Sequence, residues 1–239
     1  MSILAQLRDY VQFPEISHLR DTFLSSIKIF RNLDQVAHEG AWPQPSDFPD
    51  HEYVHEDLKN LAVVLARLKD TIDARDRIPE LLKRLSEQVE DFDMVNLEGQ
   101  FADLVVRETG LNHFTSAKRL SGGTLRFFAL LAILIDQADG SPQVLCIEEP
   151  ELGLHPDALP IVAELLVEAS QRVQIVIATH SDILVSAIGR EAPESVLVCE
   201  RGDAGTKMTR LDPEKLKSWL EEYSLGDLWL MGELGGKRW

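Results

Sequence analysis

The hydrophobic pattern changes character part-way along the 239-residue chain. Residues 1–118 give short, separate signals, whereas the pattern from Ser121 onward is regular. Mostly apolar stretches alternate with polar turns there, at residues 124–137, 143–147, 156–170 and 173–179. The short continuous runs are typical of parallel strands that are covered on both faces, and the longer ones have the length of helices. Residues 119–239 are therefore predicted to form an α/β region with a parallel-rich sheet flanked by helices.

The first region, residues 1–118, is predicted to be a helical and β insertion. Helical spacing occurs in four stretches, and short strands are expected in two: helices at Leu4–Tyr10, Leu19–Phe30, Leu58–Leu68 and from Pro79 to Val89, strands at Met94–Leu97 and Phe101–Val106. Prolines at 43, 45 and 49 mark an extended loop, since residues before proline avoid helix. Near the end of the chain, residues 195–211 read as a hairpin at the sheet edge, and Asp212 as the cap of a last helix to about Tyr223.

Composition narrows the class of protein. The net charge is −16, which argues against broad, sequence-independent binding of nucleic acid and leaves a local basic patch open. No apolar stretch approaches the length of a membrane span, and the N-terminus lacks a signal-peptide pattern. Cys146 and Cys199 lie in apolar, strand-like runs and are expected to be buried, reduced thiols. We expect a cytoplasmic protein.

Two acidic residues end the apolar strand at 143–147. Glu148 and Glu149 precede Pro150, and His180 follows the next strand. Because parallel strands place ligands at their carboxyl ends, these side chains are expected to meet at one edge of the sheet. One carboxylate can hold magnesium through water while its neighbour polarises an attacking water, and His180 can contact a γ-phosphate. A solvated acidic turn and a buried structural histidine are the simpler alternatives.

The sequence Ser121-Gly122-Gly123 opens the long apolar helix. Serine is a common helix cap, and this alone explains its presence. Two glycines also leave backbone N–H groups open to an incoming phosphate. The functional alternative gains weight from the acidic pair and the histidine downstream.

The phosphate-binding loop expected beside such motifs does not occur in these 239 residues. No G-x-x-x-x-G-K-[ST] is present, and the one Gly-Lys pair is Gly236-Lys237. That loop supplies an amide cradle, a lysine and a hydroxyl ligand for magnesium. Without it the chain offers a nucleotide mainly carboxylates, so we expect weak binding of ATP by the chain alone.

Together these motifs resemble the C-terminal half of ABC/RecF/SMC-type ATPases, most closely bacterial predicted ATPases of the AAA family. The resemblance also covers Asn60–Leu65 and the ending from Ser224 to Trp239. Two positions depart from the wider superfamily. Most of its members have Asp at the position of Glu148, and transporters have Gln at the position of Thr124.

The resemblance implies an α/β P-loop NTPase fold of ABC-ATPase type, its N-terminal strand and phosphate loop missing. It implies that Ser121, Gly122 and Gly123 form the signature motif. Glu148 would be the acid on the magnesium side, Glu149 the catalytic glutamate and His180 the switch histidine. Residues Glu151–Pro156, with His155, would form the loop at the subunit contact. ATP and Mg2+ are the implied cofactors. The implied partners are a segment or protomer with a phosphate loop, in a dimer, and an effector protein.

Two other functions stay open at this point. A split or degenerate relative would be a non-hydrolysing regulatory or structural module. The remote alternative is a zinc metalloprotease, because His51-Glu52-Tyr53-Val54-His55 is a literal H-E-x-x-H with Glu80 as a generic third ligand. Its proline-rich flanks argue against the helix that this motif needs.

Overall fold

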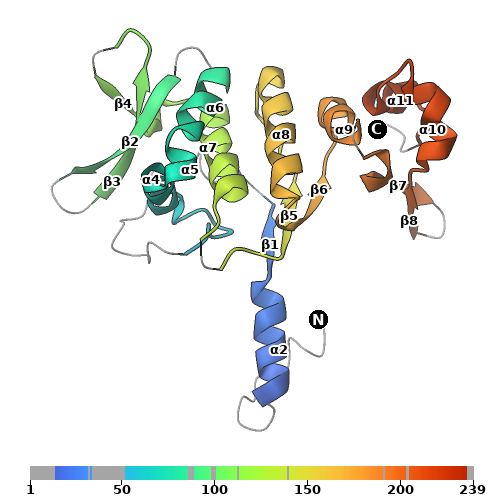
Figure 1. Cartoon of the computed structure of the whole chain (residues 1–239), viewed down its shortest axis with the longest axis horizontal. Coiled ribbons are helices and arrows are strands. Elements are labelled where there is room, and N and C mark those ends of the chain that lie inside the picture. Colours follow the sequence, from blue (N-terminus) through green and yellow to red (C-terminus); the bar gives the residue numbers. More distant parts are fainter. Residues whose placement is uncertain are drawn as a thin grey trace.

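A three-stranded parallel sheet organises the molecule in the computed structural model. The structure describes residues 14–31, 33, 52–85, 89–97, 101–111, 113–138, 140–190, 192–202 and 205–235. Strands β1 (Ile27–Phe30), β5 (Val144–Glu148) and β6 (Gln174–Ala178) lie in the order β1-β5-β6 (Figure 1). All three are parallel, so their carboxyl ends share one edge of the sheet. The parallel sheet expected from the sequence is confirmed.

One face of this sheet is covered and the other is partly open. On the covered face, Leu145 and Ile147 are buried in the core. On the opposite face, Ile29, Cys146 and Val176 lie in register on the three strands, the first two half-buried and Val176 51% exposed. Within the described residues, the covering expected on both faces of β5 is complete on one face alone, since Cys146 on the second face is half-buried.

Three helices form the covered side, one before β5 and one after each of β5 and β6. They are α7 (Gly122–Ile135), α8 (Leu159–Ala169, after a short 3-10 turn at Pro156–Ala158) and α9 (Asp182–Gly189). Helix α7 is buried along almost its whole length, which explains why its sequence is apolar on every side. The helices expected after Ser121, Pro156 and Asp182 are confirmed.

The first region contributes helices and an antiparallel sheet. Its elements are α2 (Pro14–Ser25), α4 (Leu61–Asp70), α5 (Ile72–Arg75), α6 (Arg77–Leu85), β2 (Val89–Leu97), β3 (Phe101–Glu108) and β4 (Phe114–Ser116). The strands pair in the order β2-β3-β4. Figure 1 shows them at one side of the molecule, beyond α4, α6 and α7. The expected mixture of helices and strands before residue 119 is present.

Helical spacing misled the prediction for residues 19–30. The helix ends at Ser25, and Ile27 and Phe30 belong to β1 instead. Two β-branched isoleucines and pairing with β5 favour the strand here. The segments expected at Leu4–Tyr10 and around residues 43–49 lie outside the described residues.

A single hydrophobic cluster joins the first region to the sheet layer. Phe92 on β2 meets Phe128 on α7 edge to face, with ring centroids 5.4 Å apart. Arg67 on α4 donates to the buried Asp136 just after α7, at 2.6 Å. The boundary expected between residues 118 and 119 stays a prediction.

The C-terminal part forms a separate layer around α9. A hairpin of β7 (Leu197–Gly202) and β8 (Gly205–Arg210) is followed by α10 (Pro213–Leu220) and α11 (Leu225–Met231). The hairpin is confirmed, but it makes a two-stranded sheet of its own and does not join the β6 edge. α11 continues past the expected last helix and packs on α9. There a Cβ at Gly226 would lie 2.2 Å from the Ser186 hydroxyl, so the close approach needs glycine.

The burial predicted for the two cysteines is wrong, whereas both are free thiols as predicted. Cys146 is half-buried on β5, and Cys199 is exposed on the β7–β8 hairpin, whose second strand is exposed throughout. Within those same residues, no helix has both the length and the apolarity to cross a membrane.

Candidate functional site

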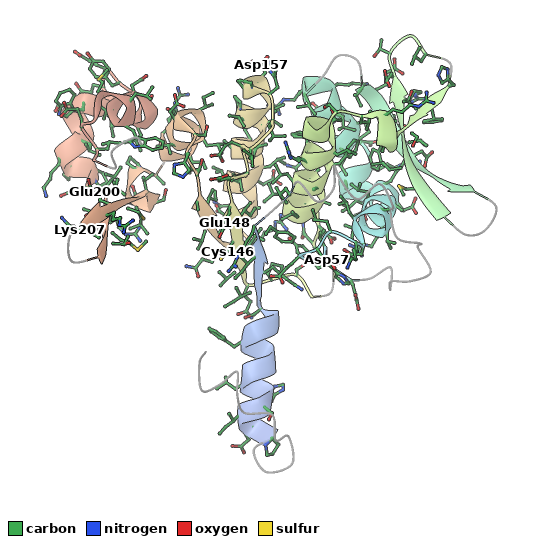
Figure 2. The ribbon with its side chains drawn as sticks, turned by 180° about the vertical axis from the view of Figure 1, so that it is seen from behind. Asp57, Cys146, Glu148, Asp157, Glu200 and Lys207 are labelled. Atoms are coloured by element: carbon green, nitrogen blue, oxygen red, sulfur yellow. The ribbon has the colours of Figure 1, made fainter. Side chains whose placement is uncertain are left out.

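Glu148 ends β5 at the carboxyl edge of the sheet. Its side chain is 52% exposed, and Oε1 lies 3.8 Å from Nε of Arg31, which directly follows β1 (Figure 2 labels Glu148 and Cys146 along β5). The pair is exposed and loose, so it contributes little to stability. The Glu148 carboxylate therefore stays accessible to solvent, which is required of a group that binds a hydrated magnesium ion.

Glu149 adopts a left-handed backbone conformation with φ of 47°. This region is unfavourable for a residue with a Cβ and occurs where surrounding contacts enforce it. One such contact is visible: the Glu149 N–H donates to the Ala178 carbonyl of β6 at 2.7 Å. The strand therefore ends in a fixed turn that directs Glu149 differently from Glu148.

His180 lies opposite Glu149 at the end of β6. Its Nε2 is 4.0 Å from Glu149 Oε1, and the side chains are 71% and 46% exposed respectively. Both groups therefore face solvent at the edge where parallel strands place their ligands. Of the residues assigned to the nucleotide site from the sequence, Glu149 and His180 are thus brought to the same edge of the sheet.

Glu151 joins the turn after β5 to the end of β6. Its Oε1 accepts a hydrogen bond from the Thr179 hydroxyl at 2.7 Å and another from the His180 N–H at 2.8 Å. The Thr179 oxygen in turn accepts from the Ser181 N–H at 2.9 Å. Ser181 caps α9 by accepting from the Leu184 N–H. The backbone on both sides of His180 is therefore fixed.

Ser121 caps α7 as the sequence predicts. Its Oγ accepts from the Thr124 N–H at 3.1 Å. A Cβ at Gly123 would lie only 2.6 Å from the Gly153 carbonyl oxygen, and a Cβ at Gly153, where φ is 70°, would collide with the Arg126 guanidinium. The first turn of α7 thus rests directly on the turn that follows Glu149. Gly123 serves this contact.

His155 lies further along the same turn. It is 73% exposed at its side chain, and its Nδ1 accepts from the Asp157 N–H at 3.3 Å (Figure 2 labels Asp157). No contact recorded within the described residues joins it to Glu149 or His180. The structure therefore places His155 at the surface, apart from the acidic pair.

Neither Arg31 nor the role of Glu151 is predicted by the sequence pattern. Because Ile27 and Phe30 fit helical spacing, the sequence does not predict β1. A strand at these residues would have placed Arg31 beside Glu148. Glu151 gives no signal, since an acidic residue in a turn is ordinary; only the fold shows which groups it reaches.

The described residues of the H-E-x-x-H motif do not lie on a helix, which the metalloprotease alternative requires. Residues 52–55 are not helical, and His55 Nε2 pairs with Glu52 Oε2 at 2.9 Å. His51 lies outside the described residues. Within them, no three His, Cys, Asp or Glu side chains are grouped as a metal site, so Glu80 does not complete one.

A family model covers most of the chain. The family described as "AAA domain, putative AbiEii toxin, Type IV TA system" matches residues 7–186. The chain belongs to this AAA-domain family. None of the curated proteins matches it.

A solved structure shows the same fold, and two others are similar over part of the chain. An Smc head bound to the C-terminal winged-helix domain of ScpA aligns with a TM-score of 0.54 and 15% identity, over 84% of this chain and 62% of that one. An SMC ATPase studied for ATP-driven dimerization and DNA-stimulated activation is 20% identical over 67% of this chain and 96% of its own, with a TM-score of 0.47. The Smc head of Pyrococcus furiosus is 19% identical over 67% of this chain and 41% of its own, with a TM-score of 0.46. The AAA-domain chain has the α/β fold of P-loop NTPases of the SMC type.

Proposed function

We propose that this AAA-domain chain contributes half of an ATP-hydrolysing site. The observation that carries the proposal is the meeting of Glu149 and His180, 4.0 Å apart at the ends of adjacent parallel strands. A carboxylate and an imidazole at this edge can act on a water and on a phosphate oxygen respectively.

In this proposal Glu149 polarises the attacking water and His180 contacts the γ-phosphate. Glu148, whose carboxylate is exposed, would hold Mg2+. When bound, the ion neutralises charge on the phosphates. The left-handed backbone of Glu149 supports the division of roles, because it separates the direction of its side chain from that of Glu148.

Ser121, Gly122 and Gly123 act across a dimer interface. They open α7, a helix of 14 residues, so their N–H groups and the helix dipole favour an anion at that end. Exposed His155 lies at the subunit contact. Because the first turn of α7 touches Gly153, an approaching phosphate would press on the turn that carries Glu149.

The phosphate loop comes from another segment or protomer. The open face of the sheet supports this: Val176 is 51% exposed in an apolar strand, and β6 pairs on one side alone among the described residues. Parallel sheets of this kind are normally covered on both faces. ATP, Mg2+ and a polypeptide carrying the loop are thus the proposed ligands, with a dimer as the active form and an effector protein downstream.

Co-expression tests the proposal. The chain is produced with the polypeptide encoded directly upstream, and ATP turnover of the purified pair is compared with that of each part. The proposal expects turnover in the pair alone, and loss of turnover with His180→Ala. Equal turnover in the His180→Ala pair would contradict it.

A non-hydrolysing module is the second candidate. It is favoured by the absence of G-x-x-x-x-G-K-[ST] from the sequence. In that case the chain would associate with its partner without changing ATP turnover, and substitution of Glu149 would alter nothing that depends on nucleotide.

A further inference from the structure

We infer that Glu151 is the positioning residue of the proposed site, holding His180 in register with Glu149. The inference rests on the proposed function, because it concerns the same site. The contacts that support it are present in the chain without nucleotide. Glu151 lies two residues after Glu149 and reaches across to the end of the neighbouring strand. In the described residues no other carboxylate accepts a hydrogen bond from that strand end, and Glu149 approaches the His180 ring only to 4.0 Å.

Two hydrogen bonds fix the end of β6 from the β5 side. Glu151 Oε1 accepts from both the Thr179 hydroxyl and the His180 N–H, at 2.7 and 2.8 Å. Bonds to a charged acceptor are stronger than those between neutral groups. The link at His180 is therefore one of the stronger ties at this edge.

A third bond runs in the opposite direction. The Glu149 N–H donates to the Ala178 carbonyl at 2.7 Å, so each strand end both gives and receives a bond. This reciprocal tie sets the separation of the two backbones. The 4.0 Å distance between the Glu149 and His180 side chains follows from it.

The surroundings of Glu151 favour a single position for its carboxylate. Its other oxygen, Oε2, is buried and has no hydrogen-bond partner among the described residues. A carboxylate oxygen held away from donors is costly and persists only where the rest of the group is well bound. Oε2 of Glu151 therefore loses its solvation, while Oε1 accepts the two hydrogen bonds from the end of β6.

The experiment measures the register directly in the chain without nucleotide. Histidine is labelled with 13C and 15N, and the His180 signal is assigned by its loss in His180→Gln. Two quantities are followed: hydrogen exchange of the His180 N–H, and the shift of the His180 ring signal caused by Glu149→Gln. A residue with a merely structural role would not change the second quantity.

In Glu151→Ala we expect the His180 N–H to exchange at least roughly tenfold faster, because its acceptor is gone. In the Glu151→Ala variant, the change in the His180 ring signal caused by Glu149→Gln should be at least roughly threefold smaller. The reason is that residues in contact are coupled and separated ones are not. Glu151→Gln keeps an oxygen that accepts both bonds, so it should restore most of each. Glu164→Ala, which removes an exposed carboxylate of α8 paired with Arg84, should change neither.

Thr179→Val keeps the protein testable if Glu151→Ala does not fold. It removes one donor to Glu151 together with the acceptor of the Ser181 N–H, and it leaves the His180 N–H bond, so an intermediate loss of ring response is expected. Unchanged exchange and ring response in the folded Glu151 variants would overturn the inference. Absence of ATP turnover in the assembled pair would contradict the proposed function alone.

Discussion

Glu149 and His180 face each other across the ends of β5 and β6, with Oε1 and Nε2 4.0 Å apart. Their backbones are joined in both directions, by the Glu149 N–H to Ala178 and by Glu151 to the His180 N–H. Both side chains remain solvent-facing. The arrangement combines a fixed backbone with accessible chemical groups, which is what a preorganised hydrolytic edge requires.

The isolated chain should bind ATP weakly. Its proposed nucleotide edge carries Glu148, Glu149 and Glu151 against the cations Arg31 and, when protonated, His180. Without an amide cradle and lysine, three carboxylates disfavour a polyphosphate. Calorimetry with Mg-ATP should show no saturable binding at millimolar nucleotide; micromolar binding would reveal a phosphate site elsewhere in the chain.

Gly122→Asp should abolish ATP-dependent association with the phosphate-loop partner. The carboxylate would repel the phosphate at the start of α7, while the partner's own nucleotide binding should persist. Sedimentation of the mixed proteins with and without ATP measures this. Association that survives in the variant would reduce Ser121-Gly122-Gly123 to a helix cap.

Gly123→Ala should instead lower stability. Its Cβ would lie 2.6 Å from the Gly153 carbonyl, so the turn after Glu149 must shift. Overpacking of this kind typically costs about 1–3 kcal/mol. Urea unfolding of the variant beside the parent provides the value, and an unchanged midpoint would show that the contact between α7 and the turn is absent in solution.

Arg67→Ala should destabilise the protein by about 3 kcal/mol, because it leaves a buried carboxylate without its cation. Asp136 is 2% exposed at its side chain and 2.6 Å from Arg67 Nη2. Lys59→Ala, which breaks an exposed ion pair with Asp57, is the matched control and should cost about 0.5 kcal/mol or less. Equal losses in the two variants would contradict the buried pair.

Asp136 should also give a distinctive pH dependence. Burial raises its pKa above the ordinary 3.8, and the Arg67 guanidinium offsets this in part. The folded state then holds the proton more tightly than the unfolded state, so this residue's contribution to the free energy of unfolding falls as pH rises from 3.8 through the raised pKa. Asp136→Asn removes that dependence, and its stability relative to the parent should rise across the same range. Urea unfolding at a series of pH values measures the difference; a constant offset would exclude the raised pKa.

Much of the fold after Ser121 was predictable because each element there carries a strong local signal. The apolar strand before Glu148 and the capped helix after Ser121 are examples, and both are confirmed. Residues 19–30 were not predictable in this way, since Ile27 and Phe30 fit helical spacing and only pairing with β5 selects the strand. Local pattern competes there with a long-range contact, and the contact prevails.

The site shows the same limit. Strand ends in the sequence predict that Glu149 and His180 share an edge, because parallel strands impose it. They do not predict that Glu151 bonds to His180, since this depends on the exact course of the turn through Gly153. The opposite error concerns Cys146: its apolar strand suggested burial, but burial depends on whether anything covers the second face.

The substitution Glu149→Gln in the chain paired with its phosphate-loop partner tests the central claim most directly. The measurement is single-turnover hydrolysis of ATP alongside nucleotide binding, with Glu164→Gln as control. The proposed roles predict a fall in the hydrolysis rate of roughly 100-fold or more, while binding survives, because the water-polarising base is lost and Glu148 still holds the metal. Hydrolysis at the parent's rate in the Glu149→Gln assembly would contradict the account.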